Sequence, residues 1–265
     1  MKQRPPRPTY QGLSLVIPAY NEEGRLPRTL AEIRRYRETF VGVLEVIVAD
    51  DGSEDGTAAL VRRSIAEMPY LQLVELPHRG KGSAVRAGVL AARQPWVVVC
   101  DADLSMPVEQ VDRFVAALAG GAQIAVGSRE MQGAQRYGEP ARRHLMGRIF
   151  NMLVRALVVN GFDDTQCGFK GFSLAAAHQI FSRQRLNGFS FDVEVLYLAR
   201  KRGYALREVA IDWHFDADSR VRPGVDALKM TLDLLHIRLL AFSGAYRSRS
   251  AEAPATSLET RKRRI

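Results

Sequence analysis

The feature that most constrains the fold is an alternation of short apolar runs with helix-like segments in the first half of the chain. Five runs rich in β-branched residues predict strands, at residues 13–17, 44–49, 71–76, 96–100 and 124–126. Helix-like patterns lie between them, at residues 26–40, 57–67 and 83–92. Because this rhythm is typical of parallel sheets, the chain is predicted to form a doubly wound α/β domain. Ligands of such sheets bind beyond the carboxyl ends of the strands, so residues that follow strands are candidates for chemistry.

An Asp-x-Asp pair follows the fourth apolar run, in the segment VVVCDADLS at residues 97–105. Side chains two residues apart leave an extended segment on the same face, so Asp101 and Asp103 are predicted to converge on one cation. Their hard carboxylate oxygens suit Mg²⁺, which retains several waters and binds phosphates. A lone Asp-x-Asp is also common in exposed turns. Here, however, other polar segments follow the neighbouring strands.

The first strand is followed by IPAYNEE at residues 17–23. Pro18 has no amide hydrogen and is expected to stop the strand ladder there. The ring of Tyr20 is suited to stack on a base or a sugar. The alternative is an ordinary loop that ends in a helix cap.

Two further loops carry carboxylates, glycines and a lysine. The second strand leads into ADDGSEDGT at residues 49–57, where a carboxylate is suited to accept the imide N–H of uracil. Ser53 and Asp55 are interpreted as turn and cap residues. The third strand leads into HRGKGSA at residues 78–84, whose glycines permit close backbone approach. Lys81 supplies a point charge, or else is a solvated side chain at a helix start.

In this order and at these distances, the four segments resemble the inverting family 2 glycosyltransferases of GT-A fold. The resemblance narrows to the polyprenyl- and dolichyl-phosphate sugar synthases through DADLSMP at residues 101–107 and DTQCGFK at residues 164–170. It covers residues 13–246 and implies a Rossmann-like, mainly parallel sheet flanked by helices, with C-terminal amphipathic helices. Ser105, where mannosyl synthases usually have Gln, and the closing segments within 234–246 point to the dolichyl-phosphate glucosyltransferase branch.

The resemblance implies metal-dependent, inverting transfer of a sugar, with glucose from UDP-glucose favoured, to the phosphate of a polyprenyl or dolichyl lipid. The implied nucleotide-sugar site consists of Pro18, Tyr20, Glu22, Asp50, Asp51, Lys81, Gly82, Asp101, Ala102 and Asp103. Asp101 and Asp103 are implied to hold Mg²⁺ or Mn²⁺, with Ser105 or water as a further ligand. Arg129 and Arg143 are implied to bind the acceptor phosphate and complete the catalytic set. That phosphate is largely dianionic and needs no general base.

Other hypotheses remain open from the residues alone. The donor is alternatively GDP-mannose or a UDP-N-acetylhexosamine, or the acceptor is soluble. A non-enzymatic nucleotide or nucleic-acid binder is suggested by 38 Lys and Arg against 29 Asp and Glu, a formal charge of +9. Because the basic residues lack an interleaved aromatic platform, no nucleic-acid partner is predicted. Asp192, within FSFDVE at residues 189–194, is interpreted as a helix N-cap in preference to a catalytic residue.

Two later segments, 142–159 and 225–242, repeat apolar residues at helical spacing, and the first adds a basic face. Packing on the core is the usual arrangement of such stripes, whereas the resemblance favours contact with an anionic membrane surface. The predicted organisation is a polar segment at 1–12, one catalytic domain at 13–246 and a basic, disordered tail at 247–265.

Localisation is predicted from what the chain lacks. Its first residues contain no apolar signal-peptide core, and no stretch approaches the ~18 apolar residues of a transmembrane helix. Its two cysteines have no metal-type spacing, which indicates a reducing compartment. The protein is therefore expected to be cytoplasmic and peripherally associated with the cytoplasmic face of a membrane.

Overall fold

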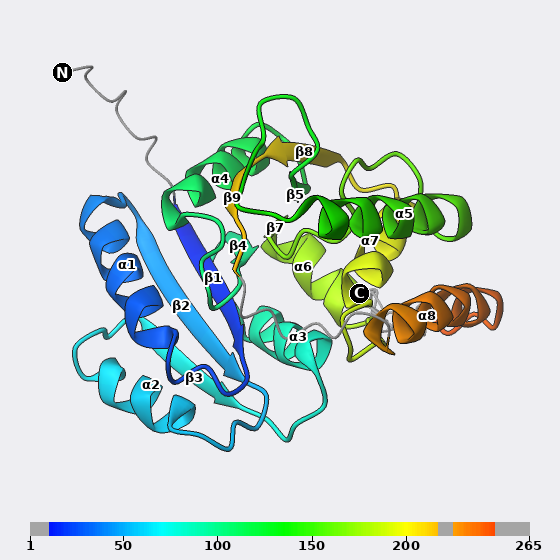
Figure 1. Cartoon of the computed structure of the whole chain (residues 1–265). Coiled ribbons are helices and arrows are strands. Elements are labelled where there is room, and N and C mark those ends of the chain that lie inside the picture. The colour runs from blue at the N-terminus through cyan, green and yellow to red at the C-terminus, as the bar shows by residue number, and fades with distance from the viewer. Residues whose placement is uncertain (1–10, 217–224, 247–265) are drawn as a thin grey trace, which may run out of the picture.

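The structure, a computed structural model, describes residues 11–216 and 225–246. The predicted tail at 247–265 and most of the predicted N-terminal segment at 1–12 lie outside the described residues. Two sheets and eight α-helices are present in the described part of the chain (Figure 1).

The main sheet has the strand order β3-β2-β1-β4-β7-β5-β8. Its strands are β1 (Gly12–Ala19), β2 (Val43–Asp50), β3 (Leu71–Glu75), β4 (Trp96–Val99), β5 (Ile124–Ser128), β7 (Lys170–Ser173) and β8 (Leu206–Ala210). Only β7 runs antiparallel to its neighbours among these seven strands. A second, two-stranded sheet pairs β6 (Gln135–Tyr137) with β9 (Asp212–His214). The predicted mainly parallel sheet is confirmed, and its five predicted strands are all present.

Helices cover both faces of the main sheet. They are α1 (Leu26–Thr39), α2 (Thr57–Ile65), α3 (Lys81–Ala91), α4 (Val111–Ala119), α5 (Ala141–Leu157), α6 (Leu174–Phe181), α7 (Phe191–Lys201) and α8 (Val225–Phe242). Side chains of α1, α2 and α4 form one buried cluster with the sheet, and those of α3, α6 and α7 form another on the opposite face (Figure 1).

Strand β1 shows why its sequence reads as a continuous apolar run. Leu15 and Ile17 pack into the first cluster, whereas Val16 between them packs into the second. Successive side chains of a strand point to opposite faces, so a strand covered on both sides is apolar throughout. Its end differs from the prediction, because β1 continues past Pro18, which pairs with Ala49 of β2. The ladder ends early only toward β4, where the last paired residue of β1 is Val16.

Helices α5 and α8 lie together on one side of the molecule and leave apolar side chains exposed. In α5 these are Leu145, Met146, Ile149, Met152, Leu153 and Leu157, and in α8 they are Leu228, Leu232, Leu235, Leu239 and Phe242. These eleven residues are called the α5–α8 surface below. Among the described residues of the two helices, Val154, Leu234 and Ile237 are fully buried in the core, and Phe150, Leu240 and Ala241 pack against it. Packing of the predicted stripes on the core is therefore wrong.

Among the helices of residues 11–216 and 225–246, none combines the length and the apolarity that a bilayer crossing requires.

Candidate active site

The candidate site lies where the strand order of the main sheet reverses. From β1 the chain continues to β2 and β3 on one side, whereas β4 pairs with β1 on the other. At such a switch point the loops after the two neighbouring strands diverge and leave a crevice at the carboxyl edge. The predicted polar segments follow β1, β2, β3 and β4. The topology therefore brings them to one edge.

Hydrogen bonds hold the loop after β1 between those after β2 and β4. The amide of Asn21 donates to Ser53 Oγ at 2.8 Å, and the amide of Glu22 donates to Thr57 Oγ1 at 2.8 Å. On the other side, Thr29 of the following helix α1 donates through Oγ1 to the carbonyl of Ala102 at 2.5 Å. These side chains fix the spacing of the three loops before any ligand binds.

The two aspartates after β2 both organise backbone. Asp50 accepts hydrogen bonds from the amide and the hydroxyl of Ser53. Asp51 accepts from the amides of Arg79 and Gly80 at 3.0 and 2.8 Å, which ties the β2 loop to the β3 loop. Gly80 has φ +117°, a conformation that favours glycine.

The turn role predicted for Ser53 is confirmed, whereas the N-cap of α2 is Gly56 and not Asp55. Ser53 closes the turn with Asp50. Asp55 Oδ1 accepts from the amide of Thr57, the first residue of α2, at 3.0 Å. These two residues therefore shape the loop after β2.

An aromatic pair stands beside these aspartates. The rings of Tyr20 and His78 stack with centroids 4.1 Å apart, and His78 Nδ1 lies 2.8 Å from Asp51 Oδ2. Glu22, assigned to the same pocket by the resemblance, is buried with its carboxylate 3.3 Å from Arg25. The sequence interpretation gave no role to His78, because a histidine after a strand has no pattern of its own. Only the fold brings it against Tyr20.

Lys81 lies against the Asp-x-Asp pair. Its Nζ is 2.6 Å from Asp101 Oδ1, so the interpretation of Lys81 as a solvated side chain is wrong. Burial opposes its protonation, yet the Asp101 and Asp192 carboxylates outweigh this and raise the pKa of Lys81. Lys81 is therefore a permanent cation at the carboxyl edge. The adjacent Gly82 packs against the loop that precedes α7, where its amide donates to the carbonyl of Asn187 at 2.7 Å.

The donor set around Asp101 and Asp103 fits a hard divalent cation that retains waters. Asp103 Oδ1 accepts from the amide of Ser105 at 2.9 Å, and Leu104 between them has φ +46°. Burial and the charge of Asp101 raise the pKa of Asp103, and a cation between the two would favour its ionised form. No third His, Cys, Asp or Glu joins the pair among the described residues. Further ligands would be water or the buried Ser105, as the resemblance implies.

The backbone of Gly168 lies close to this pair. A Cβ on Gly168 would lie 2.4 Å from Asp101 Oδ2, so any side chain at that position would displace the carboxylate. The loop of residues 164–170 thus shapes the carboxyl edge from the far side of β4.

A buried ion pair continues this row of charges. Lys170 Nζ lies 2.6 Å from Asp192 Oδ1 and also donates to the carbonyl of Cys167. The N-cap of α7 is Ser190, so the interpretation of Asp192 as the N-cap is wrong. Burial raises the pKa of Asp192, although Lys170 and Lys81 act in the opposite direction. In the order Asp101, Lys81, Asp192 and Lys170 the charges alternate in sign, which offsets the cost of burying each charge.

The two arginines implied for the acceptor phosphate lie next to aromatic rings of one segment. Arg129 follows β5 and sits 5.2 Å from the Trp213 ring, while Arg143 on α5 sits 4.9 Å from the Phe215 ring. Arg129 also forms a two-pronged pair with the buried Asp164, Nε to Oδ2 at 2.6 Å and Nη2 to Oδ1 at 3.0 Å. Burial acts against ionisation of Asp164, but Arg129 prevails and lowers its pKa to about 2.

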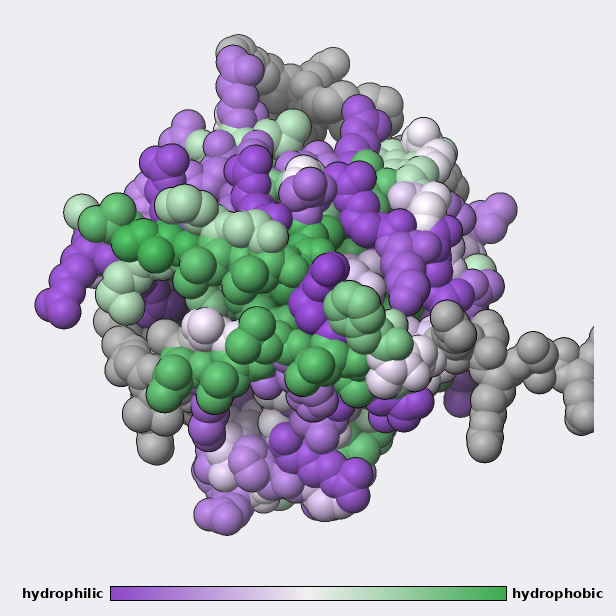
Figure 2. All heavy atoms as spheres, turned by 90° about the vertical axis from the view of Figure 1, so that its right-hand side faces the viewer, coloured by the Kyte–Doolittle hydropathy of each residue, from purple (hydrophilic) through white to green (hydrophobic). Residues whose placement is uncertain are grey.

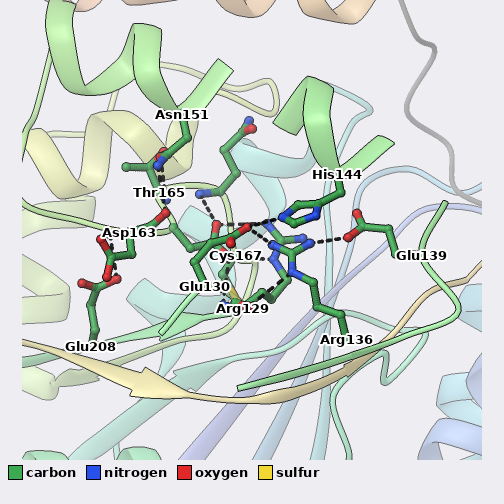
Figure 3. Close-up of polar contacts among 12 residues, drawn as sticks. Arg129, Glu130, Arg136, Glu139, His144, Asn151, Asp163, Thr165, Cys167 and Glu208 are labelled. Carbon is green, nitrogen blue, oxygen red and sulfur yellow. Dashed lines mark hydrogen bonds and ion pairs between the residues drawn. The ribbon is translucent and has the colours of Figure 1, made fainter. Parts of the chain in front are cut away.

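Helix α5 is tied to this region at two points (Figure 3). Arg136 donates to Glu130 and Glu139, and His144 on α5 lies 2.9 Å from the same Glu130. Further along α5, Asn151 donates to the carbonyl of Asp163 at 2.8 Å and accepts from Thr165 Oγ1 at 2.7 Å. The exposed helix is therefore held against the loops that carry Arg129.

Comparison with known proteins identifies the family. The sequence profile described as "Glycosyl transferase family 2" matches residues 14–181, more than half of the chain. The chain belongs to glycosyl transferase family 2. The profile includes β1 to β4 with their loops and ends in α6. The enzyme class predicted from the four motifs is confirmed: the protein is a glycosyltransferase.

Curated relatives extend this similarity over most of the glycosyltransferase. Dolichyl-phosphate beta-glucosyltransferase of Mus musculus is 37% identical over 260 residues, covering 91% of this chain and 78% of the relative. The human protein of the same name is 35% identical over 257 residues, with 91% and 78% covered. The Saccharomyces cerevisiae protein is 32% identical over 255 residues, with 89% and 76% covered.

A solved structure confirms the GT-A fold. Glucosyl-3-phosphoglycerate synthase from Mycobacterium tuberculosis, solved with Mn²⁺, UDP and glucosyl-3-phosphoglycerate, superimposes with a TM-score of 0.63. It is 22% identical, and the match covers 88% of this chain and 80% of that one.

Proposed function

We propose that this glycosyltransferase transfers glucose from UDP-glucose to the phosphate of a polyprenyl or dolichyl lipid, using Mg²⁺ or Mn²⁺. The observation that carries the proposal is the similarity, over about nine-tenths of the chain, to proteins named dolichyl-phosphate beta-glucosyltransferase. The intact Asp101 and Asp103 pair beside Lys81, at the switch point of the sheet, supports it.

The loops that follow β1, β2, β3 and β4, called the strand-end loops below, are suited to bind the donor. The stacked rings of Tyr20 and His78 offer an aromatic wall for a base or a ribose, next to the loop that Asp51 holds. Pro18, Glu22 and Asp50 complete the proposed nucleoside pocket, with Gly82 and Ala102 at its border. Lys81 supplies a fixed positive charge for a diphosphate. Asp101 and Asp103 would hold the cation, which when bound neutralises charge on the departing UDP.

The acceptor needs orientation more than it needs activation. An oxygen of the lipid phosphate forms the new bond to the anomeric carbon of glucose, while the bond from that carbon to the UDP oxygen breaks and UDP departs with the electron pair. The family-typical inversion places the two oxygens on opposite sides of the carbon. Arg129 and Arg143 are suited to hold the dianion in line, because positioning and charge neutralisation lower the barrier without proton transfer.

The α5–α8 surface supports a peripheral contact with the membrane that carries the lipid. Figure 2 shows hydrophobic side chains gathered in broad bands across this side of the molecule, bordered by hydrophilic residues. Apolar patches of this kind on a single chain mark interaction sites, and an amphipathic helix with a basic border suits an anionic bilayer. The proposed location is the cytoplasmic face of that membrane.

The proposal is tested by transfer of radiolabelled sugar into organic-extractable lipid. Purified protein is supplied with polyprenyl phosphate, Mg²⁺ and a panel of UDP- and GDP-sugars, with EDTA as a control. Label from UDP-glucose that EDTA abolishes is the expected result. Selective label from GDP-mannose or from a UDP-N-acetylhexosamine would contradict the donor assignment. Transfer only to a soluble acceptor would contradict the lipid.

A further inference from the structure

A second hollow, apart from the donor site, lies where the C-terminal ends of α5 and α7 meet α8. Its volume is about 500 Å³, within the range of small-ligand sites. Four cationic side chains line it: Arg155 from α5, Arg200 and Lys201 from α7, and Arg238 from α8. Asp192, in the site described above, lies at the opposite end of α7, roughly 14 Å away at 1.5 Å per residue.

Among the described residues, the cations of this hollow have no acidic partners. Of the described residues that line it, none is an Asp or a Glu. Within residues 11–216 and 225–246, none of the four forms an ion pair of 4.0 Å or less. Their contacts are with rings and carbonyls: Lys201 lies 5.8 Å from the Tyr197 ring, and Arg200 Nη2 donates to the carbonyl of Asn160 at 3.2 Å.

Helix ends account for only part of this charge. Arg155 lies in the last turn of α5, and Arg200 and Lys201 lie in the last turn of α7, where cations interact favourably with the helix dipole. Arg238 lies outside the last turn of α8, so this effect does not reach it. Four like charges around one hollow repel each other, and an anion within it would relieve that repulsion.

The hollow opens at the border of the α5–α8 surface. Leu157 belongs both to that surface and to the lining of the hollow. On α8, Arg238 lies between two residues of this surface, Leu235 and Leu239. Its guanidinium lies 5.9 Å from the ring of Phe242. Cationic and apolar groups are thus arranged as the headgroup and the acyl chains of a lipid would require.

We propose that this hollow binds the phosphate of an anionic phospholipid headgroup and so orients the glycosyltransferase on the bilayer. The occupant is a lipid already in the membrane, separate from the lipid acceptor. The inference rests on the membrane contact proposed above. A neutral bilayer would bury the apolar side chains only, whereas an anionic bilayer would also place negative charge beside the four cations.

The test compares binding of the full chain to phosphatidylcholine vesicles with and without phosphatidylglycerol, using Lys201→Gln/Arg238→Gln. Both side chains are exposed and make no hydrogen bond among the described residues, so the variant is expected to fold. Its dissociation constant for anionic vesicles should rise about tenfold, with little change for neutral ones. Arg238→Lys, which keeps the charge, should bind nearly as wild type does.

The control is Arg28→Gln/Arg63→Gln, which removes two exposed charges from α1 and α2. A change below about twofold is expected, because these positions lie away from the α5–α8 surface (Figure 1). Equal losses in the two double variants would overturn the site in favour of diffuse attraction. Tight calorimetric binding of inorganic phosphate, together with vesicle binding that does not depend on phosphatidylglycerol, would overturn the lipid as occupant.

Transfer in neutral detergent micelles separates this inference from the proposed function. Wild type and Lys201→Gln/Arg238→Gln are expected to transfer glucose to polyprenyl phosphate equally well there. Loss of micellar transfer in the variant alone would overturn the separation of the hollow from the active site. Absence of transfer in wild type would contradict the proposed function while leaving the vesicle comparison fully readable.

Discussion

The strand-end loops and the α5–α8 surface deal with their side chains in opposite ways. At the strand ends, charged groups are paired inside the protein, as Lys81 is with Asp101 and Lys170 is with Asp192. On the α5–α8 surface, large apolar side chains face outward, and the neighbouring cations have no acidic partner among the described residues. The first region is organised before a ligand arrives. The second is stabilised only when its apolar area is removed from water, as by a bilayer, at about 25 cal/mol per Å².

The largest expected effect comes from the pair after β4. Asp103→Asn keeps the size of the side chain but removes a carboxylate, and we expect sugar transfer to fall by at least about 1,000-fold because charge on the departing diphosphate is no longer offset. Glu38→Gln, which removes one exposed carboxylate from α1, should keep full activity. The readout is transfer at several Mg²⁺ concentrations. A folded Asp103→Asn variant with normal turnover and unchanged metal dependence would contradict the assigned role.

The next effect distinguishes two roles of Arg129. Arg129→Lys keeps the charge but loses the two-pronged contact, and we expect kcat/KM for the lipid phosphate to fall about 100-fold with little change in the KM for the donor. Asp164→Asn is the comparison, because it removes the internal partner of Arg129 but leaves its guanidinium. If both variants lose thermal stability and activity in parallel, Arg129 serves only to hold the loop of residues 164–170.

Acid should lower the free energy of unfolding by protonating Asp164, the partner of Arg129. Its depressed pKa means that the Arg129 pair contributes stability above the unfolded pKa of 3.8, and this contribution is lost as pH falls toward about 2. The loss is about 2 kcal/mol of unfolding free energy, measured by urea denaturation across that window. Asp164→Asn should lack this component. An identical acid dependence in wild type and variant would assign the loss to other groups.

The smallest expected effect concerns the outward-facing region. Leu239→Glu places a charge on a side chain that is 66% exposed, and we expect the dissociation constant for vesicles to rise about tenfold while micellar transfer is unchanged. Val41→Glu is the matched control, since Val41 is 50% exposed and lies in the connection between α1 and β2. Equal effects of the two substitutions on vesicle binding would remove the distinction between the two regions.

Local pattern was sufficient for the parallel part of the sheet and for the loops that follow it. The five predicted strands and the helices between them are present, since apolar runs between glycine- and aspartate-rich turns specify them locally. The helix over Val225–Phe242 has the predicted bounds. By contrast, β7 was not predicted, because it has only four residues and no turn motif that would indicate a strand. It lies between β4 and β5 in the sheet, although it follows both of them in the chain.

What the sequence determined by itself is therefore the parallel part of the sheet and the family to which the chain belongs. The tertiary structure decided which side chains are paired: Tyr20 with His78, Lys81 with Asp101, Lys170 with Asp192, and Arg129 with Asp164. It also decided that the apolar stripes of α5 and α8 face outward. Periodicity reports that a helix has an apolar side. Which surface that side meets depends on contacts between segments far apart in the chain, and no local pattern encodes them.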